Sequence, residues 1–527
     1  MSTPVINLSS LDGSNGFRLD GGGRERAGYS VSNAGDVNGD GFDDIVVGAY
    51  SSSFSGFYTG ASFVVFGKAA GFAASMNLFD LDGVSGFRMD GVGDLDFSGA
   101  SVSSAGDVNG DGFDDVVIGA WRADLNADMS GSSYVVFGRA SGFGASMSLS
   151  GLDGNNGFRL DGDNIYDHFG FSVSGACDVN GDGLDDVIIG APGTESGGSS
   201  YVVFGKASGF DAHPDLSGLD GRNGFRLAGV VLGDDSGESV SAAGDVNGDG
   251  FADVIIGAPD ADSNGKVNSG SSYVVFGQAS GFSAVMNLSG LDGSNGFRLD
   301  GENVDDFSGT SVSSAGDING DGFDDVIIGS THTDPNNIGP GSSNVVFGQA
   351  SGFDASMSLS NLDGHNGFRL TGAADSDYAG WSVGGAGDIN GDGFGDLVIG
   401  APHADPNGPS SGSCYVVFGR ASGFGASVDL SSLNGNTGVR MDGTFQFDNS
   451  GWSINGAGDV NGDGFDDVIV GAPQTNEKGR YSGSSYLIFG RSDFGGGVVI
   501  PGTPGDDVLR GTSAADIFEA GDGNDLL

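Results

Sequence analysis

Cysteine, positive charge and long apolar segments are all scarce in this sequence, and each scarcity excludes a class of protein. Two cysteines among 527 residues, Cys177 and Cys414, cannot form a disulfide scaffold. Only 20 Lys and Arg accompany 71 Asp and Glu, and a net charge of −51 would repel nucleic acids and anionic membranes. No apolar run approaches the roughly 18 residues of a membrane span. The first ten residues, MSTPVINLSS, lack the features of a cleavable secretory signal.

Glycine and acidic residues dominate instead. The 104 glycines make up nearly a fifth of the chain, without the three-residue period of collagen, while hydrophobic residues still reach 37%. This composition indicates many turns around an apolar core. The strong acidity is typical of a protein that binds many cations or works in salt.

One unit recurs seven times, and its most regular part is the string Asp-x-Asn-Gly-Asp-Gly. Successive copies lie 67 to 72 residues apart, so internal repetition organises the chain. Each unit also holds runs of four to six β-branched or aromatic residues bounded by Gly, Asp, Asn or Ser, which predict strands. No stretch of ten or more residues shows helical periodicity between capping signals. The sequence therefore predicts an all-β fold.

Four strands per unit and seven units predict a seven-bladed β-propeller of four-stranded antiparallel blades over residues 1–492. An open solenoid, the competing repeat fold, needs atypical capping repeats at its ends, and none are present. A strand of the Phe-Arg-Leu type precedes the first Asp-rich string, whereas none follows the last unit. We expect this spare N-terminal strand, around Phe17, to complete the last blade and close the ring.

The Asp-rich loops predict calcium sites, about one per blade. Numbered from the first Asp, positions 1, 3, 5 and 9 carry Asp, Asn, Asp and Asp, and position 7 offers a backbone carbonyl. Hard oxygen ligands at alternate positions, with Gly allowing the chain to wrap, suit Ca²⁺. The predicted ligands are Asp36, Asn38, Asp40, Phe42 and Asp44; Asp107, Asn109, Asp111, Phe113 and Asp115; Asp178, Asn180, Asp182, Leu184 and Asp186; Asp245, Asn247, Asp249, Phe251 and Asp253; Asp317, Asn319, Asp321, Phe323 and Asp325; Asp388, Asn390, Asp392, Phe394 and Asp396; and Asp459, Asn461, Asp463, Phe465 and Asp467.

Two other interpretations of these loops are weaker. A turn sequence explains the Asn and Gly, but it does not explain an Asp at position 9 in all seven copies. An EF-hand needs a bidentate Glu at position 12, where this chain has Val or Ile, as at Val47 and Ile118. Position 8 varies, with Ala252 and Gly395 in place of Asp, so we exclude it from the ligands.

The units resemble FG-GAP repeats, those of integrin α-subunit propellers. The resemblance rests on Gly-x-Ser-Val, on Asp-Val-Asn-Gly-Asp-Gly-Phe-Asp-Asp, on Val-Ile-Ile-Gly-Ala-Pro (187–192) and on the closing Phe-Gly, and it covers about residues 5–492. It implies a seven-bladed propeller with Ca²⁺ in the loops that join strands 1 and 2. This chain departs from integrins in having a complete loop in every blade and no leg or membrane-spanning region, so integrin signalling is not implied.

The C-terminal segment resembles a second calcium-binding repeat. After a linker at 493–501, residues 502–527 fall into nonapeptides with Asp507, Asp516 and Asp525 at equivalent positions. This pattern is similar to truncated RTX or haemolysin-type repeats, which wind into a parallel β-roll, and we expect the start of such a roll here. The resemblance implies a bacterial protein exported by a C-terminal, type I-like signal that lies outside this chain, and it suggests that the chain is a fragment.

Variation between repeats indicates where a partner would bind. In a four-stranded antiparallel blade, loops 1–2 and 3–4 share one face and loops 2–3 and 4–1 share the other. The second face carries the segments that differ most, such as 24–26, 121–128 and 166–168. Because loops on a rigid scaffold often determine specificity, this variable face is a candidate binding surface, although unconstrained drift explains the variation equally well. The Arg of each Phe-Arg-Leu strand is interpreted as a structural ion pair, with Asp20 or Asp161 as partners.

These observations favour a secreted, calcium-binding adhesion or recognition protein that is not an enzyme, at the cell surface or outside the cell. We expect a monomer that binds an extracellular protein or glycan and neither binds nucleic acid nor spans a membrane. The alternative is the non-catalytic binding part of a larger secreted enzyme that acts on polysaccharides or lipids.

Overall fold

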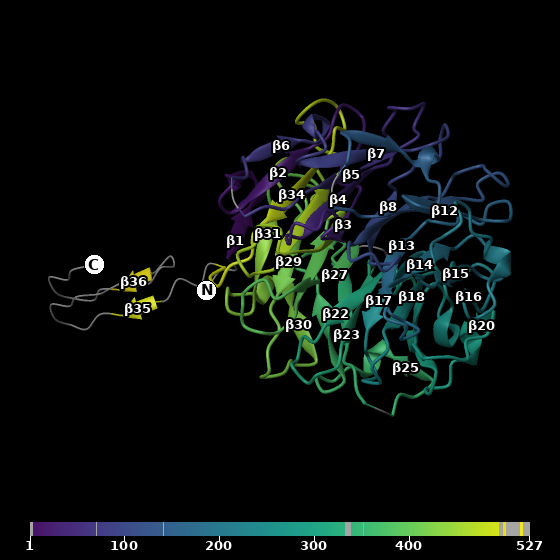
Figure 1. Ribbon diagram of the computed structural model, residues 1–527. Coiled ribbons are helices and arrows are strands. Elements are labelled where there is room, and N and C mark those ends of the chain that lie inside the picture. Colours follow the sequence, from purple (N-terminus) through teal and green to yellow (C-terminus); the bar gives the residue numbers. More distant parts are fainter. Residues whose placement is uncertain are drawn as a thin grey trace.

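The computed structural model describes residues 4–69, 71–140, 142–332, 339–350, 352–494, 499–501 and 517–519. Within these ranges, seven sheets of four or five strands follow one another along the chain, as the sequence-ordered colours of Figure 1 show. The first strand of each sheet contacts the first strands of both neighbouring sheets, so the seven first strands form a closed ring. The predicted all-β, seven-bladed propeller is confirmed. No helix in the described part of the chain is both long and apolar enough to cross a bilayer.

The first and second strands of the blades form the inner part of the propeller. All second strands are buried along their whole length, because both faces of a blade pack against neighbours. The first strands are β3 (Ser30–Gly35), β8 (Ser101–Gly106), β13 (Val173–Cys177), β17 (Ser239–Gly244), β22 (Ser311–Gly316), β27 (Ser382–Gly387) and β32 (Ser453–Gly458). The second strands are β4 (Asp44–Ala49), β9 (Asp115–Ala120), β14 (Asp186–Ala191), β18 (Asp253–Ala258), β23 (Asp325–Ser330), β28 (Asp396–Ala401) and β33 (Asp467–Ala472).

The third and fourth strands continue each blade outward in antiparallel pairing. The third strands are β5 (Ala61–Val65), β10 (Ser132–Val136), β15 (Ser199–Val203), β19 (Ser271–Val275), β24 (Ser342–Val346), β29 (Ser413–Val417) and β34 (Ser484–Ile488). The fourth strands are β7 (Gly86–Asp90), β12 (Gly157–Asp161), β16 (Gly224–Ala228), β21 (Gly296–Asp300), β26 (Gly367–Thr371), β31 (Gly438–Asp442) and, for the last blade, β2 (Gly16–Asp20).

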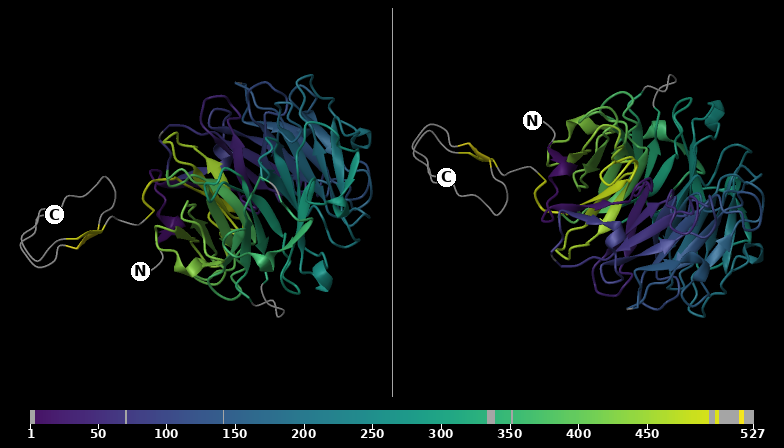
Figure 2. Two further views of the ribbon diagram at one scale, coloured as in Figure 1. Left: turned by 90° about the horizontal axis from the view of Figure 1, so that it is seen from below. Right: turned by 90° about the horizontal axis from the view of Figure 1, so that it is seen from above.

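The ring closes where the N-terminal strand joins the last blade. β2 pairs antiparallel with β34, with Phe17 opposite Leu487, which is the position that the count of Phe-Arg-Leu strands predicts. Figure 2 shows from two sides that the purple N-terminal strands lie beside the yellow strands of the last blade. Phe17 is fully buried and its ring stacks on Phe72 at a centroid distance of 4.6 Å. The two ends of the repeat array are therefore held together by core packing as well as by hydrogen bonds.

The core of the described residues consists of seven clusters, each shared by two neighbouring blades. Five further stacked phenylalanine pairs repeat the contact made by Phe17, with centroids 4.1 to 4.4 Å apart. In each pair, the Phe of a fourth strand meets the Phe that follows the third strand of the next blade. In the sixth blade Val439 replaces the first of these phenylalanines, and it packs in a cluster with Phe494.

Six of the seven sheets contain a fifth strand that the sequence did not predict. It is three residues long, runs parallel to the fourth strand and comes from the segment just before the fourth strand of the next blade. Each of these six sheets therefore has one strand more than the four predicted. In the second blade Pro214 stands where the fifth strand would run, and that sheet keeps four strands because proline cannot donate to a ladder. The fifth strands are β1 (Val5–Asn7), β6 (Ser75–Asn77), β11 (Ser146–Ser148), β20 (Val285–Asn287), β25 (Ser356–Ser358) and β30 (Ser427–Asp429).

Short 3-10 helices and one further strand pair complete the described structure. Seven helices follow the position of the fifth strand and one lies in a loop of the fourth blade: η1 (Leu8–Ser10), η2 (Leu78–Asp80), η3 (Leu149–Gly151), η4 (Leu216–Gly218), η5 (Ser263–Gly265), η6 (Leu288–Gly290), η7 (Leu359–Asn361) and η8 (Leu430–Ser432). β35 (Val499–Pro501) pairs in parallel with β36 (Ile517–Glu519). The other residues of the predicted RTX-type segment, with Asp507, Asp516 and Asp525, lie outside the described residues, so the β-roll stays a prediction.

Candidate functional site

Each Asp-rich loop leaves the end of a first strand and wraps around its own first aspartate. In the first blade, Asp36 Oδ1 accepts the backbone N–H groups of Gly39 and Asp40 at 2.7 and 3.0 Å, and Asp36 Oδ2 accepts that of Gly41 at 2.8 Å. Asp40 Oδ1 accepts the N–H of Phe42 at 3.1 Å. The bond from position 6 to Oδ2 of position 1 recurs in every blade. The side chains at positions 1 and 5 thus shape the loop themselves.

The aspartate at position 9 is completely buried and ties the loop to the third strand. Asp44 Oδ2 accepts the N–H of Val37 at 3.1 Å, and Asp44 Oδ1 accepts that of Gly67 at 2.9 Å. Gly67 belongs to the Phe-Gly pair that closes the third strand, and the bond to the equivalent glycine recurs in all blades. The recurrence of Asp at position 9, which the sequence analysis attributed to metal, therefore has a structural cause as well.

Burial also makes the position-9 carboxyl a weak acid. Loss of solvation, together with repulsion from Asp40 and Asp36, raises the pKa of Asp44 to about 8. The same causes raise the pKa of Asp115 to about 9. In the described part of the chain, none of the loop carboxylates forms a salt bridge with Lys or Arg. Negative charge collects in each loop without a positive partner.

The donor set fits a hard divalent cation in its chemistry. A carboxylate oxygen has two lone-pair directions, so an oxygen that accepts one N–H group can still ligate a metal. The amide of position 3 and the carbonyl of position 7 add neutral oxygens. Among the described residues, however, no three Asp, Glu, His or Cys side chains lie close enough together to hold a metal ion. The oxygen donors that would hold calcium follow one another along each loop but do not converge on one point, and the calcium sites stay a prediction.

Position 8, which we excluded from the ligands, links neighbouring loops. Asp114 Oδ2 accepts the N–H of Asp36 in the preceding blade at 2.7 Å, while the Asp114 N–H donates to the Asp36 carbonyl at 3.3 Å. The side-chain bond recurs at four more blade boundaries. At the other two, Ala252 and Gly395 keep only the backbone bond, to Asp178 and Asp317 respectively. We call the side-chain bond the position-8 latch.

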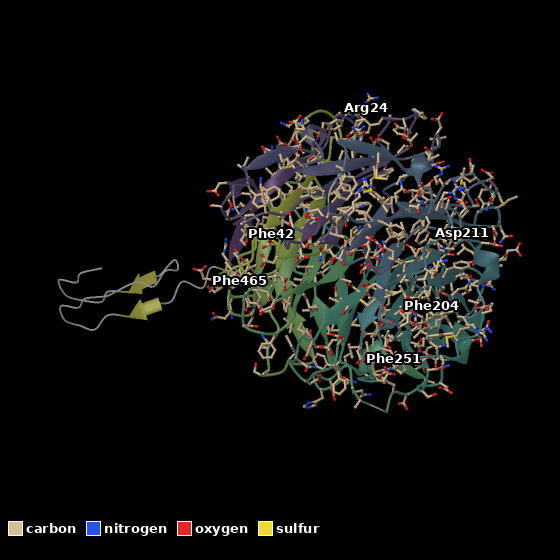
Figure 3. The ribbon with its side chains drawn as sticks, in the orientation of Figure 1. Arg24, Phe42, Phe204, Asp211, Phe251 and Phe465 are labelled. Carbon is tan, nitrogen blue, oxygen red and sulfur yellow. The ribbon has the colours of Figure 1, made fainter. Side chains whose placement is uncertain are left out.

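A second contact joins the same loops. Gly39 adopts a φ of 73°, and a Cβ added there would lie 2.2 Å from the ring of Phe113 in the next blade. Position 4 must therefore be glycine for two reasons, its left-handed backbone and the aromatic ring that covers it. The series of contacts is complete around the propeller, because Phe42 of the first blade covers Gly462 of the last blade in the same way. Figure 3 labels three of these covering residues, Phe42 and Phe465 near each other on neighbouring blades and Phe251 farther around the propeller.

Loss of one position-8 latch should cost a measurable part of the stability. Asp114→Ala leaves the Asp36 N–H without its charged acceptor, and we expect the free energy of unfolding to fall by about 1–3 kcal/mol. Asp114→Asn keeps a side-chain acceptor and serves as the matched control, with a loss of less than half of that value. Chemical unfolding of the two variants and the wild type measures the effect. Equal stability of Asp114→Ala and the wild type would contradict the latch.

The FG-GAP repeat matches seven segments, residues 27–65, 98–136, 169–203, 236–275, 308–346, 379–417 and 450–488, which together make up just over half of the chain. The chain belongs to the FG-GAP repeat family. Each FG-GAP segment spans the first three strands of one blade, including its Asp-rich loop, and ends before the Phe-Gly pair whose glycine binds position 9.

Curated relatives of this chain are much longer proteins. Integrin alpha-5 of Xenopus laevis is 28% identical over 253 residues, which cover 46% of this chain and 20% of the integrin. Integrin alpha pat-2 of Caenorhabditis elegans is 30% identical over 45% of this chain and 18% of its own length. Phosphatidylinositol-glycan-specific phospholipase D of Dictyostelium discoideum is 28% identical over 57% of this chain and 31% of the relative. The chain spans less than a third of each of these proteins.

The arginines of the fourth strands form the expected ion pairs. Arg18 Nε lies 2.7 Å from Asp20 Oδ1, and Arg159 Nε lies 2.8 Å from Asp161 Oδ1. Three further blades of the FG-GAP propeller repeat this pair. In the third blade Ala228 replaces the Asp, and in the fifth Thr371 does so. The structural interpretation of these arginines is confirmed in five blades.

The variable face has a regular scaffold that the sequence analysis missed. Every 4–1 loop holds a buried acidic residue between two neighbours, and both neighbours have positive φ in all seven blades. In six of the seven loops, the neighbour that precedes the acidic residue donates its N–H to a carbonyl of the 2–3 loop in the preceding blade, as Arg24 does to Arg480 at 3.0 Å; Gly233 is the exception. An acidic residue three positions before the Gly of Gly-x-Ser recurs in all seven repeats, and that signal could have revealed the motif. The acidic residues are Glu25, Asp96, Asp167, Asp234, Asp306, Asp377 and Asp448.

One of these buried acids should make stability depend on pH. Glu25 accepts the N–H of Gly22, and burial raises the pKa of its carboxyl to about 7. Because this folded-state pKa lies above the unfolded value of about 4.3, the native state binds the proton more tightly. The stability contribution is therefore full below about pH 4 and is lost as the pH rises through 7.

Glu25→Gln removes this titration. Between pH 5 and pH 8, we expect the variant to gain about 1–3 kcal/mol of unfolding free energy relative to the wild type. Thermal or urea unfolding across that pH range measures the difference. The control is Glu195→Gln, an exposed residue of a 2–3 loop, which should run parallel to the wild type. Parallel profiles for Glu25→Gln as well would show that Glu25 is ionised in the native state at pH 5.

Proposed function

We propose that this FG-GAP propeller is an extracellular, calcium-binding recognition protein without catalytic activity of its own. One observation carries the proposal: a uniform face of seven Asp-rich loops lies opposite a face whose loops share a backbone scaffold but differ in side chains. The first face suits repeated cation binding, and the second suits specific binding of one ligand. The similarity to integrin α-subunits supports a binding role.

Calcium is the cofactor of this proposal. The carboxylates at positions 1, 5 and 9, the amide at position 3 and the carbonyl at position 7 of each loop would hold one Ca²⁺, seven in all. The bound ions would supply the positive charge that these loops lack. Secretion by a bacterial type I-like route belongs to the same proposal, and it rests on the RTX-like pattern of residues 502–527 alone.

Two measurements test the proposal. Calorimetric titration with CaCl₂ should give a stoichiometry near seven for residues 1–494, and a stoichiometry near zero would refute calcium binding. The chain should also adhere to immobilised extracellular glycoproteins or to cells in calcium and lose that adhesion in chelator. Failure to adhere to any such surface, with calcium bound, would refute the recognition role.

A second candidate function follows from one comparison. The match to phosphatidylinositol-glycan-specific phospholipase D covers more of this chain than either integrin match does. In this alternative the propeller is the non-catalytic part of a larger secreted enzyme that acts on lipids or polysaccharides. Sequencing of the complete gene separates the two, because a catalytic domain beside the propeller would favour the enzyme.

A further inference from the structure

A pocket on the variable face gathers positive charge in a chain that has very little of it. Its volume is about 470 Å³, and it lies where the last blade meets the first. Figure 3 shows Arg24, one of its lining residues, at the outer edge of the molecule. None of the described residues that line the pocket is acidic, although the chain has 71 acidic residues. The principal lining residues are Arg24, Arg26, Arg480, Tyr50, Tyr58 and Tyr481.

Paired loops hold these side chains in place. Arg24 and Arg26 have φ values of 69° and 55°, and their N–H groups donate to the carbonyls of Arg480 and Tyr481, both at 3.0 Å. This left-handed backbone is the one that both positions adopt in all seven 4–1 loops. Glu25 lies between the two arginines, but its carboxylate is buried and accepts the N–H of Gly22 instead of entering the pocket.

The backbone scaffold is common to all blades, whereas the arginines are particular to this one. The six positions equivalent to Arg24 and the six equivalent to Arg26 contain no Lys or Arg. The positions equivalent to Arg24 are Leu95, Tyr166, Gly233, Asp305, Ser376 and Phe447, and those equivalent to Arg26 are Phe97, His168, Asp235, Phe307, Tyr378 and Asn449. The positive charge therefore does not follow from the fold.

The guanidinium groups have no carboxylate partner within the described residues. Arg24, Arg26 and Arg480 form no salt bridge there, unlike the arginines of most fourth strands. Arg26 instead lies over the rings of Tyr50 and Tyr481, 5.8 and 5.3 Å from their centroids, and Arg480 lies 4.9 Å from the ring centroid of Tyr481. Aromatic faces hold the cations without using up their hydrogen-bond donors. Arg480 donates one hydrogen bond, from Nη2 to the Tyr481 hydroxyl at 3.4 Å. Within the described residues, its other guanidinium N–H groups and those of Arg24 and Arg26 remain available to an anion.

We propose that this pocket binds a terminal acidic sugar, a pyranose ring that carries one carboxylate or one sulfate group. The planar fork of arginine matches such oxyanions, and the tyrosine rings offer apolar faces with polar edges to the C–H face of a sugar. The volume lies within the range of about 300–1,000 Å³ that is usual for small-ligand sites. This inference rests on the proposed recognition function and names its ligand class.

The charge of the whole protein favours a singly charged ligand over a polyanion. A net charge of −51 repels nucleic acids, acidic proteins and densely sulfated chains, while one oxyanion entering an arginine-lined pocket meets favourable charge locally. Neutral sugars that precede the acidic one would lie along a row of partly exposed aromatic rings. From Tyr50 a row of rings continues through Tyr29 to Trp452 and Trp381, with successive centroids 4.4, 5.7 and 4.7 Å apart.

Calorimetry with the full chain in calcium tests the pocket. The probes are methyl glucuronide and methyl galactoside 6-sulfate, with methyl glucoside and methyl galactoside as their neutral counterparts. We expect each acidic sugar to bind roughly 10–100-fold more tightly than its neutral counterpart, and we expect Arg26→Gln and Arg480→Gln to lose a similar factor. Comparing the two acidic probes distinguishes carboxylate from sulfate. Arg222→Gln, an exposed arginine of a 3–4 loop, removes the same charge and should bind like the wild type.

Three outcomes would overturn the inference. These are equal affinity for acidic and neutral sugars, unchanged affinity in both arginine variants with wild-type melting temperatures, and tighter binding of a phosphotyrosine peptide than of either acidic sugar. Failure of the pocket is distinct from failure of the proposed function. A chain that adheres to glycoprotein surfaces in calcium but binds neither acidic probe keeps its recognition role and loses this pocket as the site.

Discussion

Chelation of calcium should lower the melting temperature of this protein far more than any single substitution in a loop. An ion that binds only the native state stabilises it by RT ln(1 + [L]/Kd), about 2.7 kcal/mol per site at a hundredfold excess over Kd. Even extracellular-type sites, with Kd on the order of 10⁻⁴ to 10⁻³ M, add up over seven loops. Scanning calorimetry in chelator and in millimolar Ca²⁺ measures the difference.

Single-site variants provide the scale for this experiment. Asp111→Ala removes one position-5 carboxylate. In calcium, the melting temperature of this variant should fall by only a small share of the fall that chelation causes in the wild type. Calcium should also raise the melting temperature of the wild type much more than that of a variant in which position 5 is Ala in all seven loops. Identical transitions in chelator and in calcium would mean that the loops are turns held by backbone hydrogen bonds, and the proposed cofactor would be wrong.

Deletion of residues 1–20 should cause aggregation or a large loss of stability. The deletion removes β2 and so leaves the outer edge of β34 without its partner. It also removes Phe17, which is fully buried. Truncation of a buried Phe by itself lowers the free energy of unfolding by about 3–5 kcal/mol. Calorimetry and size-exclusion chromatography with light scattering report both effects.

Smaller deletions show which contact matters. Removal of residues 1–3 leaves β1 and β2 intact and should melt like the full chain. Phe17→Ala keeps the strand pairing and should lose only the packing contribution. If the chain without residues 1–20 stayed monomeric and melted within a few degrees of the wild type, closure by β2 would not be needed for the fold.

Strong repetition made the fold predictable from the sequence. Seven copies at a near-constant spacing fixed the number of blades, and the unequal count of Phe-Arg-Leu strands at the two ends placed Phe17 in the last blade. The fifth strands escaped prediction because three residues such as Ser75–Asn77 have no strand signature and pair with a segment far away in the sequence. Local patterns cannot reveal a pairing that only the assembled ring brings together.

The candidate sites were predictable to a lesser degree. The Asp-rich loops stood out, but the structural bonds of Asp44 and the latch at Asp114 involve backbone groups of other strands and blades, which residue types do not show. The pocket at Arg26 depends on two loops that meet only at ring closure, more than 450 residues apart in the chain. A sequence can mark such loops as variable, yet it does not indicate which side chains will face one another.

The two missing latches divide the propeller into unequal arcs. Without a side-chain bond at Ala252 and Gly395, the boundaries between the third and fourth blades and between the fifth and sixth blades are the weakest joints on the Asp-loop face. They separate an arc of two blades from an arc of five, which includes the closing strand and the arginine-lined pocket. Opening between blades would therefore begin at Asp178 and Asp317. The amide hydrogens of these two residues should exchange with solvent before those of the equivalent residues in the other loops, while the larger arc moves as one body.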